Sequence, residues 1–204
     1  MLSIKMHQLN IVNPPDSLFE NLLEYIPSVF TEAESRDFMF ALIKNINWKQ
    51  ETLIIFGKPV KTPRLTAWYG DNGVAYKYSG KQFFALPWTN ELAEIKEKTE
   101  HFADVKFNSV LLNYYRDGND SMGWHSDDEP ELGLNPIITS VNFGQERRFD
   151  FRNKNDHAKK HHIFLGNGSL LIMKGDLQHH WQHQIAKSKQ PMAGRINLTF
   201  RLIK

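Results

Sequence analysis

Residues 113–129 read NYYRDGNDSMGWHSDDE, and His125 and Asp127 stand two positions apart within this stretch. In an extended segment, residues i and i+2 point to the same side, so one short strand can present both side chains to a single metal ion. A mononuclear non-heme Fe(II) site requires two imidazoles and one carboxylate on one face of the metal and leaves the other positions open. We therefore expect this stretch to be extended and to supply two of the three protein ligands of such a site.

The third ligand must come from a distant part of the chain. His179, His180 and His183 are candidates, and spacing alone leaves all three open. In contrast, His161 and His162 lie in a basic stretch that we expect to be a solvated turn. Without a distant partner, a His-x-Asp pair more often only hydrogen-bonds locally, so the assignment depends on the rest of the chain.

Residues 195–201 read RINLTFR and alternate as a strand does. The predicted faces carry Arg195, Asn197, Thr199 and Arg201 on one side and Ile196, Leu198 and Phe200 on the other. The simplest alternative is a strand with a solvated polar face. However, two guanidiniums on one face suit a dicarboxylate such as 2-oxoglutarate, because arginine binds carboxylates through two parallel hydrogen bonds and lysine cannot.

Elsewhere the early part of the chain reads helical. Ser17-x-x-Glu20 and Thr31-x-x-Glu34 are capping boxes that predict two helix starts. Another helix is expected from Thr89 through about Thr99. The remainder contains runs rich in β-branched and aromatic residues, separated by Gly, Asn, Asp and Pro. The predicted strands are residues 110–115, 137–143, 147–151, 161–165, 169–173 and 196–202.

This pattern predicts a mainly β fold, a two-sheet jelly roll with helices packed outside one sheet. The 204 residues, of which 41% are hydrophobic, suit one domain with a sizeable core. There is no internal repeat or linker, so we expect a single domain over residues 1–204. The chain has no cysteine, which excludes disulfides and thiolate metal ligands and leaves histidine and carboxylate to bind metal.

Net charge and hydropathy say less about partners. The formal charge of +2 does not identify a nucleic-acid partner, although basic clusters occur locally. These clusters are Lys58, Lys61 and Arg64; Lys154, Lys159 and Lys160; and Lys187 and Lys189, and each also fits a solvated loop. No signal-peptide core and no run of about 18 apolar residues is present. We therefore expect no membrane partner and an intracellular, cytoplasmic protein, associated with the nucleoid if bacterial or nuclear if eukaryotic.

Taken together, these motifs resemble the AlkB family of Fe(II)- and 2-oxoglutarate-dependent dioxygenases, which dealkylate nucleic-acid bases, and especially its duplex-DNA-repairing branch. The resemblance begins at about Phe56, and the preceding 50 or so residues match only loosely. It rests on Pro63-Arg64 with Tyr69-Gly70-Asp71, Tyr76 to Gly80, residues 113–129, residues 140–151 (SVNFGQERRFDF), and residues 180–201, which include HWQH and RINLTFR.

The resemblance implies the double-stranded β-helix fold of this oxygenase class, with Fe(II) as cofactor and 2-oxoglutarate and O2 as cosubstrates. The family's interval between the distal iron histidine and the first arginine selects His183, so the implied iron ligands are His125, Asp127 and His183. For 2-oxoglutarate, the implied residues are Asn113 and Tyr115 as general contacts, Tyr115 with Arg195 at the distal carboxylate, and Arg201 with Asn197 near the iron-chelating carboxylate.

On the substrate side, the resemblance implies a lid within about residues 1–105 and a jelly-roll core over about 106–204. Tyr76 and Tyr78 would line a base pocket, and Arg64 would lie on the same side. Asp128 and Glu129 would recognise a cationic alkylated base, although a solvated acidic turn is the plain alternative. Phe56, between Ile55 and Gly57, would be a wedge that fills the gap left by an extruded base, or else a core residue.

The predicted function is therefore repair of N-alkylated DNA bases such as 1-methyladenine and 3-methylcytosine by a monomer, possible also on RNA. Decarboxylation of 2-oxoglutarate to succinate would accompany release of the alkyl group as an aldehyde. Two alternatives stay open. One is an oxygenase of the same class acting on RNA or protein, and the other is a non-enzymatic jelly-roll module whose histidines hold zinc or nothing.

Overall fold

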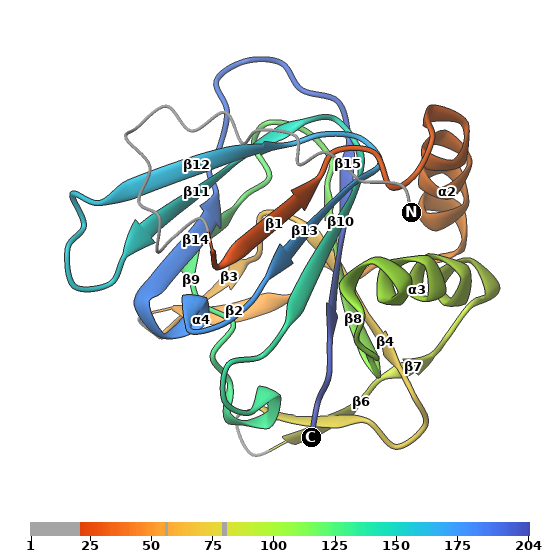
Figure 1. Ribbon diagram of the computed structural model, residues 1–204, viewed down its shortest axis with the longest axis horizontal. Helices are drawn as coiled ribbons and strands as arrows, with labels where there is room; N and C mark the ends of the chain where they lie inside the picture. The colour runs from red at the N-terminus through yellow and green to blue at the C-terminus, as the bar shows by residue number, and fades with distance from the viewer. Residues whose placement is uncertain (1–20, 56, 79–80) are drawn as a thin grey trace.

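Two facing β-sheets form the centre of the protein (Figure 1). The computed structural model describes residues 21–55, 57–78 and 81–204. The larger sheet has the strand order β1 (Leu23–Ile26), β13 (Ser169–Met173), β10 (Ile138–Gly144), β15 (Arg195–Arg201), β8 (Ser109–Tyr115), β4 (Leu65–Gly70) and β7 (Leu86–Pro87). The smaller sheet has the order β12 (Lys160–Leu165), β11 (Arg147–Asn153), β14 (Trp181–Ile185) and β9 (Met122–His125). The predicted mainly β fold class is confirmed.

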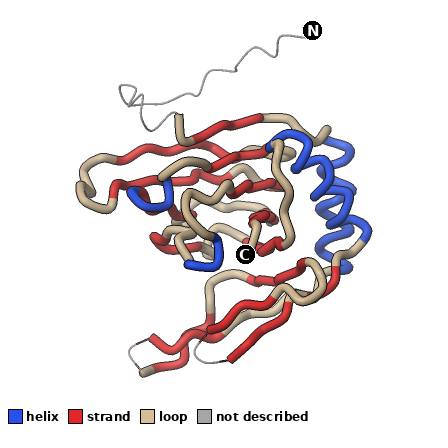
Figure 2. Tube along the Cα trace, turned by 60° about the horizontal axis from the view of Figure 1, so that its bottom comes forward, coloured by secondary structure: helices blue, strands red, loops and turns tan. Residues whose placement is uncertain are grey.

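Helices α2 (Glu32–Asn45) and α3 (Asn90–Ala103) cover one face of the larger sheet (Figures 1 and 2). Their buried side chains join one core cluster with the apolar residues of β15, and the space between the two sheets holds a second cluster. Strand β15 separates the two regions. Ile196, Leu198 and Phe200 face the helices, whereas the alternate residues face the interior between the sheets.

The helix starts follow the capping signals. Thr31 and Glu34 form the predicted reciprocal box: Thr31 Oγ1 accepts from Glu34 N at 3.2 Å, and Thr31 N donates to Glu34 Oε2 at 2.7 Å. Thr89 caps α3 by accepting from Leu92 N at 3.3 Å, and this helix continues to Ala103, past the predicted end. The box at residues 17–20 lies outside the described residues.

Several expectations about local structure were wrong. The early part of the chain contains strand β1, although it was predicted to be helical. This strand has only four residues, too few for the alternation of apolar and polar residues to indicate a strand, and it is defined by its pairing with β13. The strand predicted over residues 161–165 is confirmed as β12, but the expectation that His161 and His162 lie in a solvated turn was wrong, and the His161 side chain is buried against Trp181. Strand β14 was also missed. No described helix is both long and apolar enough to cross a membrane.

Two small hairpins extend from one end of the larger sheet (Figure 2). One pairs β2 (Thr52–Ile55) with β3 (Lys58–Lys61), and the other pairs β5 (Ala75–Tyr78) with β6 (Lys81–Phe84). Both belong to the part of the chain in which the resemblance places the substrate lid. Strand β4 lies between them in sequence and pairs with β8, so the hairpins are anchored beside the strand that carries Asn113 and Tyr115.

Candidate metal centre

Three predicted ligands come together at the edge of the smaller sheet. His125 ends β9 and pairs in register with His183 of the neighbouring strand β14. Asp127 lies two residues beyond the end of β9, so the expectation that one strand carries both first ligands was only partly right. One candidate ligand atom from each of the three side chains lies within 4.8 Å of the others. Two imidazoles and one carboxylate therefore meet at one point.

Hydrogen bonds from the turn that follows β9 hold Asp127 in place. Asp127 N donates to Gln178 Oε1 at 3.0 Å, and Ser126 Oγ donates to Trp181 O at 2.9 Å. Gln178 lies in the short helix α4 (Leu177–His180), which leads directly into β14. The turn is thus fastened to the segment that carries His183. In addition, the contact of His125 Nδ1 with Gly123 O at 2.9 Å leaves the Nε2 of that ring to face a metal.

The charges at the centre favour metal binding. Burial alone would raise the pKa of Asp127, but Arg201 and then the two histidines outweigh it and hold the pKa below its ordinary value. Arg201 Nη2 donates to Asp127 Oδ1. Burial, reinforced by the charge of His125, lowers the pKa of His183 to about 3. At neutral pH the centre therefore offers a carboxylate and a neutral imidazole, the protonation states that bind a metal ion.

A cavity opens from this centre between the sheets. Its lining includes the predicted cosubstrate residues of β8 and β15 together with five apolar or thioether residues. The lining consists of Leu111, Asn113, Tyr115, Met122, His125, Asp127, Ser140, Phe149, Met173, His183, Ile185, Arg195, Asn197, Thr199 and Arg201. All eight predicted metal and cosubstrate residues thus line one cavity.

Arg195 is the main cation of the cavity wall. Its side chain is buried, Nη2 donates to Asn142 Oδ1 at 2.5 Å, and the guanidinium carbon lies 5.1 Å from the centre of the Tyr115 ring. Within the described part of the chain, neither Nε nor Nη1 of Arg195 has a hydrogen-bond partner, and the same holds for Nε of Arg201. Buried N–H groups without partners are costly, so this wall is suited to an anionic ligand.

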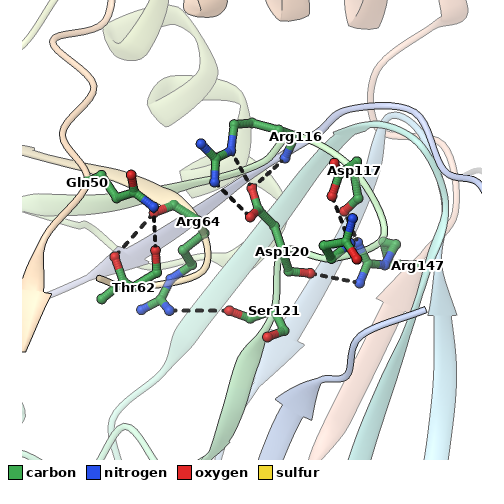
Figure 3. Close-up of polar contacts among 9 residues, drawn as sticks. Gln50, Thr62, Arg64, Arg116, Asp117, Asp120, Ser121 and Arg147 are labelled. Atoms are coloured by element: carbon green, nitrogen blue, oxygen red, sulfur yellow. Dashed lines mark hydrogen bonds and ion pairs between the residues drawn. The ribbon is translucent and has the colours of Figure 1, made fainter. Parts of the chain in front are cut away.

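Amide side chains line the space between the two arginines. Asn197 faces Asn113 across the β8–β15 pair and donates to Ser140 Oγ at 2.7 Å. Asn113 Oδ1 accepts from Arg64 Nε at 2.7 Å, and Arg64 Nη1 also donates to Ser121 O at 3.4 Å (Figure 3). Arg64, expected on the substrate side, therefore contacts the predicted cosubstrate residue Asn113 and does not itself line the cavity formed by the described residues.

The remaining predicted substrate residues are placed less centrally. Asp128 accepts from Lys154 Nζ at 2.9 Å, and neither Asp128 nor Glu129 lines the cavity formed by the described residues. Tyr76 and Tyr78 lie on β5, where the structure describes the backbone but not these side chains. Phe56 lies outside the described residues.

The other candidate histidines, His179 and His180, lie outside the ligand group. His179 Nε2 contacts Asn135 Oδ1 at 2.9 Å, and His180 lies 3.5 Å from Asp176 Oδ2, so neither belongs to the ligand group. The sequence interpretation did not single out Gln178, whose role depends on a contact 51 positions away along the chain. The lining residues that it missed are Leu111, Met122, Ser140, Phe149, Met173 and Ile185. The alternation of residues along a strand is the one sequence signal that could have indicated some of these six residues.

The chain is similar to known proteins along most of its length, including every residue of this site. Residues 22–201 match the 2OG-Fe(II) oxygenase superfamily. Alpha-ketoglutarate-dependent dioxygenase alkB homolog 3 of Bos taurus is 40% identical over 184 residues, which cover 85% of this chain and 64% of that protein. DNA oxidative demethylase ALKBH2 of Homo sapiens is 37% identical over 185 residues, 86% of this chain and 71% of that protein. The chain thus spans under two thirds of the length of the bovine relative.

A solved structure resembles the fold. The structure of OsALKBH1 superposes with a TM-score of 0.59 and 18% sequence identity, covering 88% of this chain and 97% of that one. At this identity the likeness concerns the fold alone. It agrees with the arrangement of two facing sheets flanked by helices.

Proposed function

Because this chain belongs to the 2OG-Fe(II) oxygenase superfamily, and within it to the AlkB family, we propose that it removes alkyl groups from N-alkylated DNA bases. The family recognised from the sequence motifs and the jelly-roll fold class are confirmed. One observation carries the proposal. The group of His125, Asp127 and His183 shares a cavity with buried arginine N–H groups that have no partner among the described residues.

The ligand group fits Fe(II). Two nitrogen donors and one carboxylate oxygen are the set that non-heme Fe(II) oxygenases use, with the remaining coordination positions open to small molecules. A zinc site in a structural role would instead be closed by four protein ligands. The three side chains also come from a turn and two paired strands, a rigid support that favours fixed ligand positions.

The cavity also fits 2-oxoglutarate. We assign the distal carboxylate to Arg195 and Tyr115, since Arg195 Nε and Nη1 are the buried donors that await an acceptor. Arg201, beside Asp127, and Asn197 would bind the carboxylate that lies next to the metal. Asn113 would contribute its amide N–H groups, because its carbonyl oxygen already accepts from Arg64.

When bound, Fe(II) and 2-oxoglutarate would supply the oxidation. One oxygen atom of O2 ends in the succinate that forms from 2-oxoglutarate with release of CO2, and the other enters the N-alkyl group, which leaves as an aldehyde. The protein's own residues bind and orient. His183 stays neutral and Asp127 ionised, so neither needs to lose a proton before binding metal. Leu111, Phe149 and Met173 contribute apolar side chains to the lining, which would disfavour bulk water beside the centre.

DNA as substrate, including methylated adenine and cytosine, is the finer part of the proposal. A relative named DNA oxidative demethylase supports it. The carboxylates of Asp128 and Glu129 come directly after the metal ligands and would favour a base made cationic by alkylation. Tyr76 and Tyr78 are proposed to stack on an extruded base, and Phe56 to assist extrusion from a duplex.

Mass spectrometry of methylated oligonucleotides tests this proposal. The protein is incubated with Fe(II), 2-oxoglutarate and ascorbate, and each of four substrates is offered: single-stranded and duplex DNA, RNA, and a methylated peptide. Loss of the methyl mass from DNA, with an equal amount of succinate, is expected, and the His183→Ala variant serves as control. Demethylation of RNA or peptide alone would replace DNA as the substrate. Absence of succinate with every substrate would favour the non-enzymatic module.

A further inference from the structure

We propose that Arg147 makes the cosubstrate site selective for a 2-oxo acid with a second carboxylate, by placing a buried positive charge behind Tyr115. This inference rests on the proposed function, since it concerns the distal end of the same cavity. Arg147 itself does not line the cavity formed by the described residues. It would therefore act through its charge and not through contact with the ligand.

Arg147 is fixed rigidly at the start of β11. Its side chain is buried, and it donates to three backbone carbonyls: Asp117 O at 3.1 Å, Asp120 O at 3.2 Å and Ala186 O at 2.8 Å. These acceptors belong to the β8–β9 loop and to the segment after β14, and Figure 3 shows the guanidinium held beside the first of these loops. Because all three acceptors are neutral, they hold the guanidinium without cancelling its charge.

The nearby carboxylate is already matched by another arginine. Asp120 accepts from Arg116 Nε at 2.7 Å and from Arg116 Nη2 at 2.9 Å, and also from the Arg116 backbone N at 2.9 Å (Figure 3). In the described part of the chain, Arg147 forms no ion pair of its own. The Asp120 carboxylate is thus paired with Arg116, while the charges of Tyr115, Asp120 and Asp117 only partly offset the lowering of the Arg147 pKa by burial.

Those neighbours form the deep end of the cavity. The guanidinium carbon of Arg147 lies 5.7 Å from the centre of the Tyr115 ring, and that of Arg195 lies 5.1 Å from the same centre. Two buried cations therefore share one aromatic ring. Burial first, and to a smaller extent the charge of Arg147, lower the pKa of Arg195 to about 10 against an opposing effect of Tyr115, and this is the expected sign for like charges held close in a dry region.

An anion bound at Arg195 would relieve this repulsion. A carboxylate there interacts favourably with both guanidiniums, so its binding should be stronger than with Arg195 alone. A 2-oxo acid that ends in a methyl group gains nothing from either charge. Arg147 should consequently change the ratio of the two affinities while leaving the affinity for the uncharged end the same.

The test is calorimetry on the full chain loaded with Ni(II), which binds without turnover. Two ligands are titrated, 2-oxoglutarate and 2-oxopentanoate, which has the same length but lacks the distal carboxylate. We expect Arg147→Gln to bind 2-oxoglutarate about tenfold more weakly, as for the loss of one charge at medium range, and 2-oxopentanoate unchanged. Arg147→Lys retains the charge and should keep most of the wild-type ratio. Arg148→Gln, on the exposed face of the same strand, is the matched control.

Each other result has a definite meaning. Equal weakening of both acids in Arg147→Gln, or a Lys variant that behaves like Gln, would show that Arg147 only fastens the loops and would overturn the inference. If Arg147→Gln does not fold, the ratio in Arg147→Met, which fills a similar volume, decides instead. Failure of the wild-type protein to bind 2-oxoglutarate would reject the proposed function itself and not this inference alone.

Discussion

His125 and His183 face each other across adjacent antiparallel strands, with their ring centres 4.3 Å apart. Register between two strands fixes which side chains meet, and a slip by one residue would turn every side chain to the opposite face. The pairing of β9 with β14 therefore places both imidazoles on the interior face together. Asp127 is supplied separately by the turn, and its position depends on hydrogen bonds instead of register.

The three ligand side chains can be tested by replacement. His125→Ala, Asp127→Ala and His183→Ala should each abolish turnover and weaken Fe(II) binding, because removal of one of three ligands dismantles the site. His179→Ala and His180→Ala, whose side chains lie outside the ligand group, are the controls and should have mild effects. Metal titration and succinate formation measure both. Loss of iron binding in His180→Ala with retention in His183→Ala would refute the assignment.

Gln178 should matter for metal affinity although it does not contact the metal. Gln178→Leu removes the acceptor for Asp127 N and should reduce metal affinity by about 10- to 100-fold, as for other residues that orient ligands. Gln178→Glu keeps an acceptor oxygen and should restore most of the affinity. Gln182→Leu, which alters a contact with Arg152 on the outer face, is the control. Equal Co(II) spectra and affinities in all variants would show that Gln178 has no positioning role.

The two arginines of β15 should differ in kinetic effect. Arg195→Lys should mainly raise the KM for 2-oxoglutarate, because lysine keeps the charge but loses the two-pronged geometry. Arg201→Ala should lower kcat more severely, since Arg201 also donates to Asp127. Steady-state kinetics at varied 2-oxoglutarate measure both constants. Unchanged saturation in both variants would contradict the assignment of this wall to the cosubstrate.

Glu100 should give the protein an acid-sensitive contribution to stability. It is buried, accepts from Phe107 N at 2.9 Å, and pairs with Lys106 at 2.7 Å and Lys96 at 3.3 Å. Burial alone would raise the pKa of Glu100, but these bonds outweigh it and lower the pKa below the ordinary 4.5. A lowered folded-state pKa means that the stabilisation is present above that ordinary value and is lost as pH falls through the folded pKa.

Urea denaturation of Glu100→Gln measures this contribution. At pH 7 the variant should be less stable by about 1 to 3 kcal/mol, as for hydrogen bonds to a charged group, and the difference should shrink at pH values below the folded pKa. Glu94→Gln, exposed on the same helix, is the control and should change little. A difference that stays constant with pH would show that the charge of Glu100 does not contribute.

Phe56, outside the described residues, provides the test of duplex preference. If it is an exposed wedge, Phe56→Ala should leave iron chemistry and melting temperature nearly unchanged but reduce repair of duplex DNA far more than repair of a single strand. Extrusion of a paired base costs a few kcal/mol, which an inserted side chain partly offsets, whereas a single strand needs no such help. Equal losses on both substrates, or a marked fall in melting temperature, would place Phe56 in the core instead.

How far the sequence predicts this structure depends on how local the signal is. The alternation of residues 195–201 predicted both faces of β15, and the box of Thr31 with Glu34 predicted a helix start, because each signal lies within a few residues. The resemblance supplied the choice of His183, which spacing left open. The strand and helix predictions both rest on local patterns of residue type that recur within a few residues.

Long-range contacts were beyond such patterns. Nothing near Gln178 indicates that its amide meets Asp127, and nothing near Arg64 indicates that it contacts Asn113, 49 positions away. His161 sits among lysines and reads as solvated, yet pairing of β12 with β11 turns it inward against Trp181. Strand β1 is recognised only by its partner β13. Tertiary pairing, and not local preference, decided each of these positions.

The division of β15 between two interiors also limits which sequences this protein can tolerate. Residues 196, 198 and 200 are fully buried under the helices, and residues 195, 197 and 199 are buried in the cavity. Only Arg201 is partly exposed, and it contacts Asp127. The strand therefore has no solvent-facing position at which a neutral change could accumulate. A mutation anywhere along it alters either the stability of the fold or the chemistry of the site, so adaptation to a new substrate must come from the hairpins and loops.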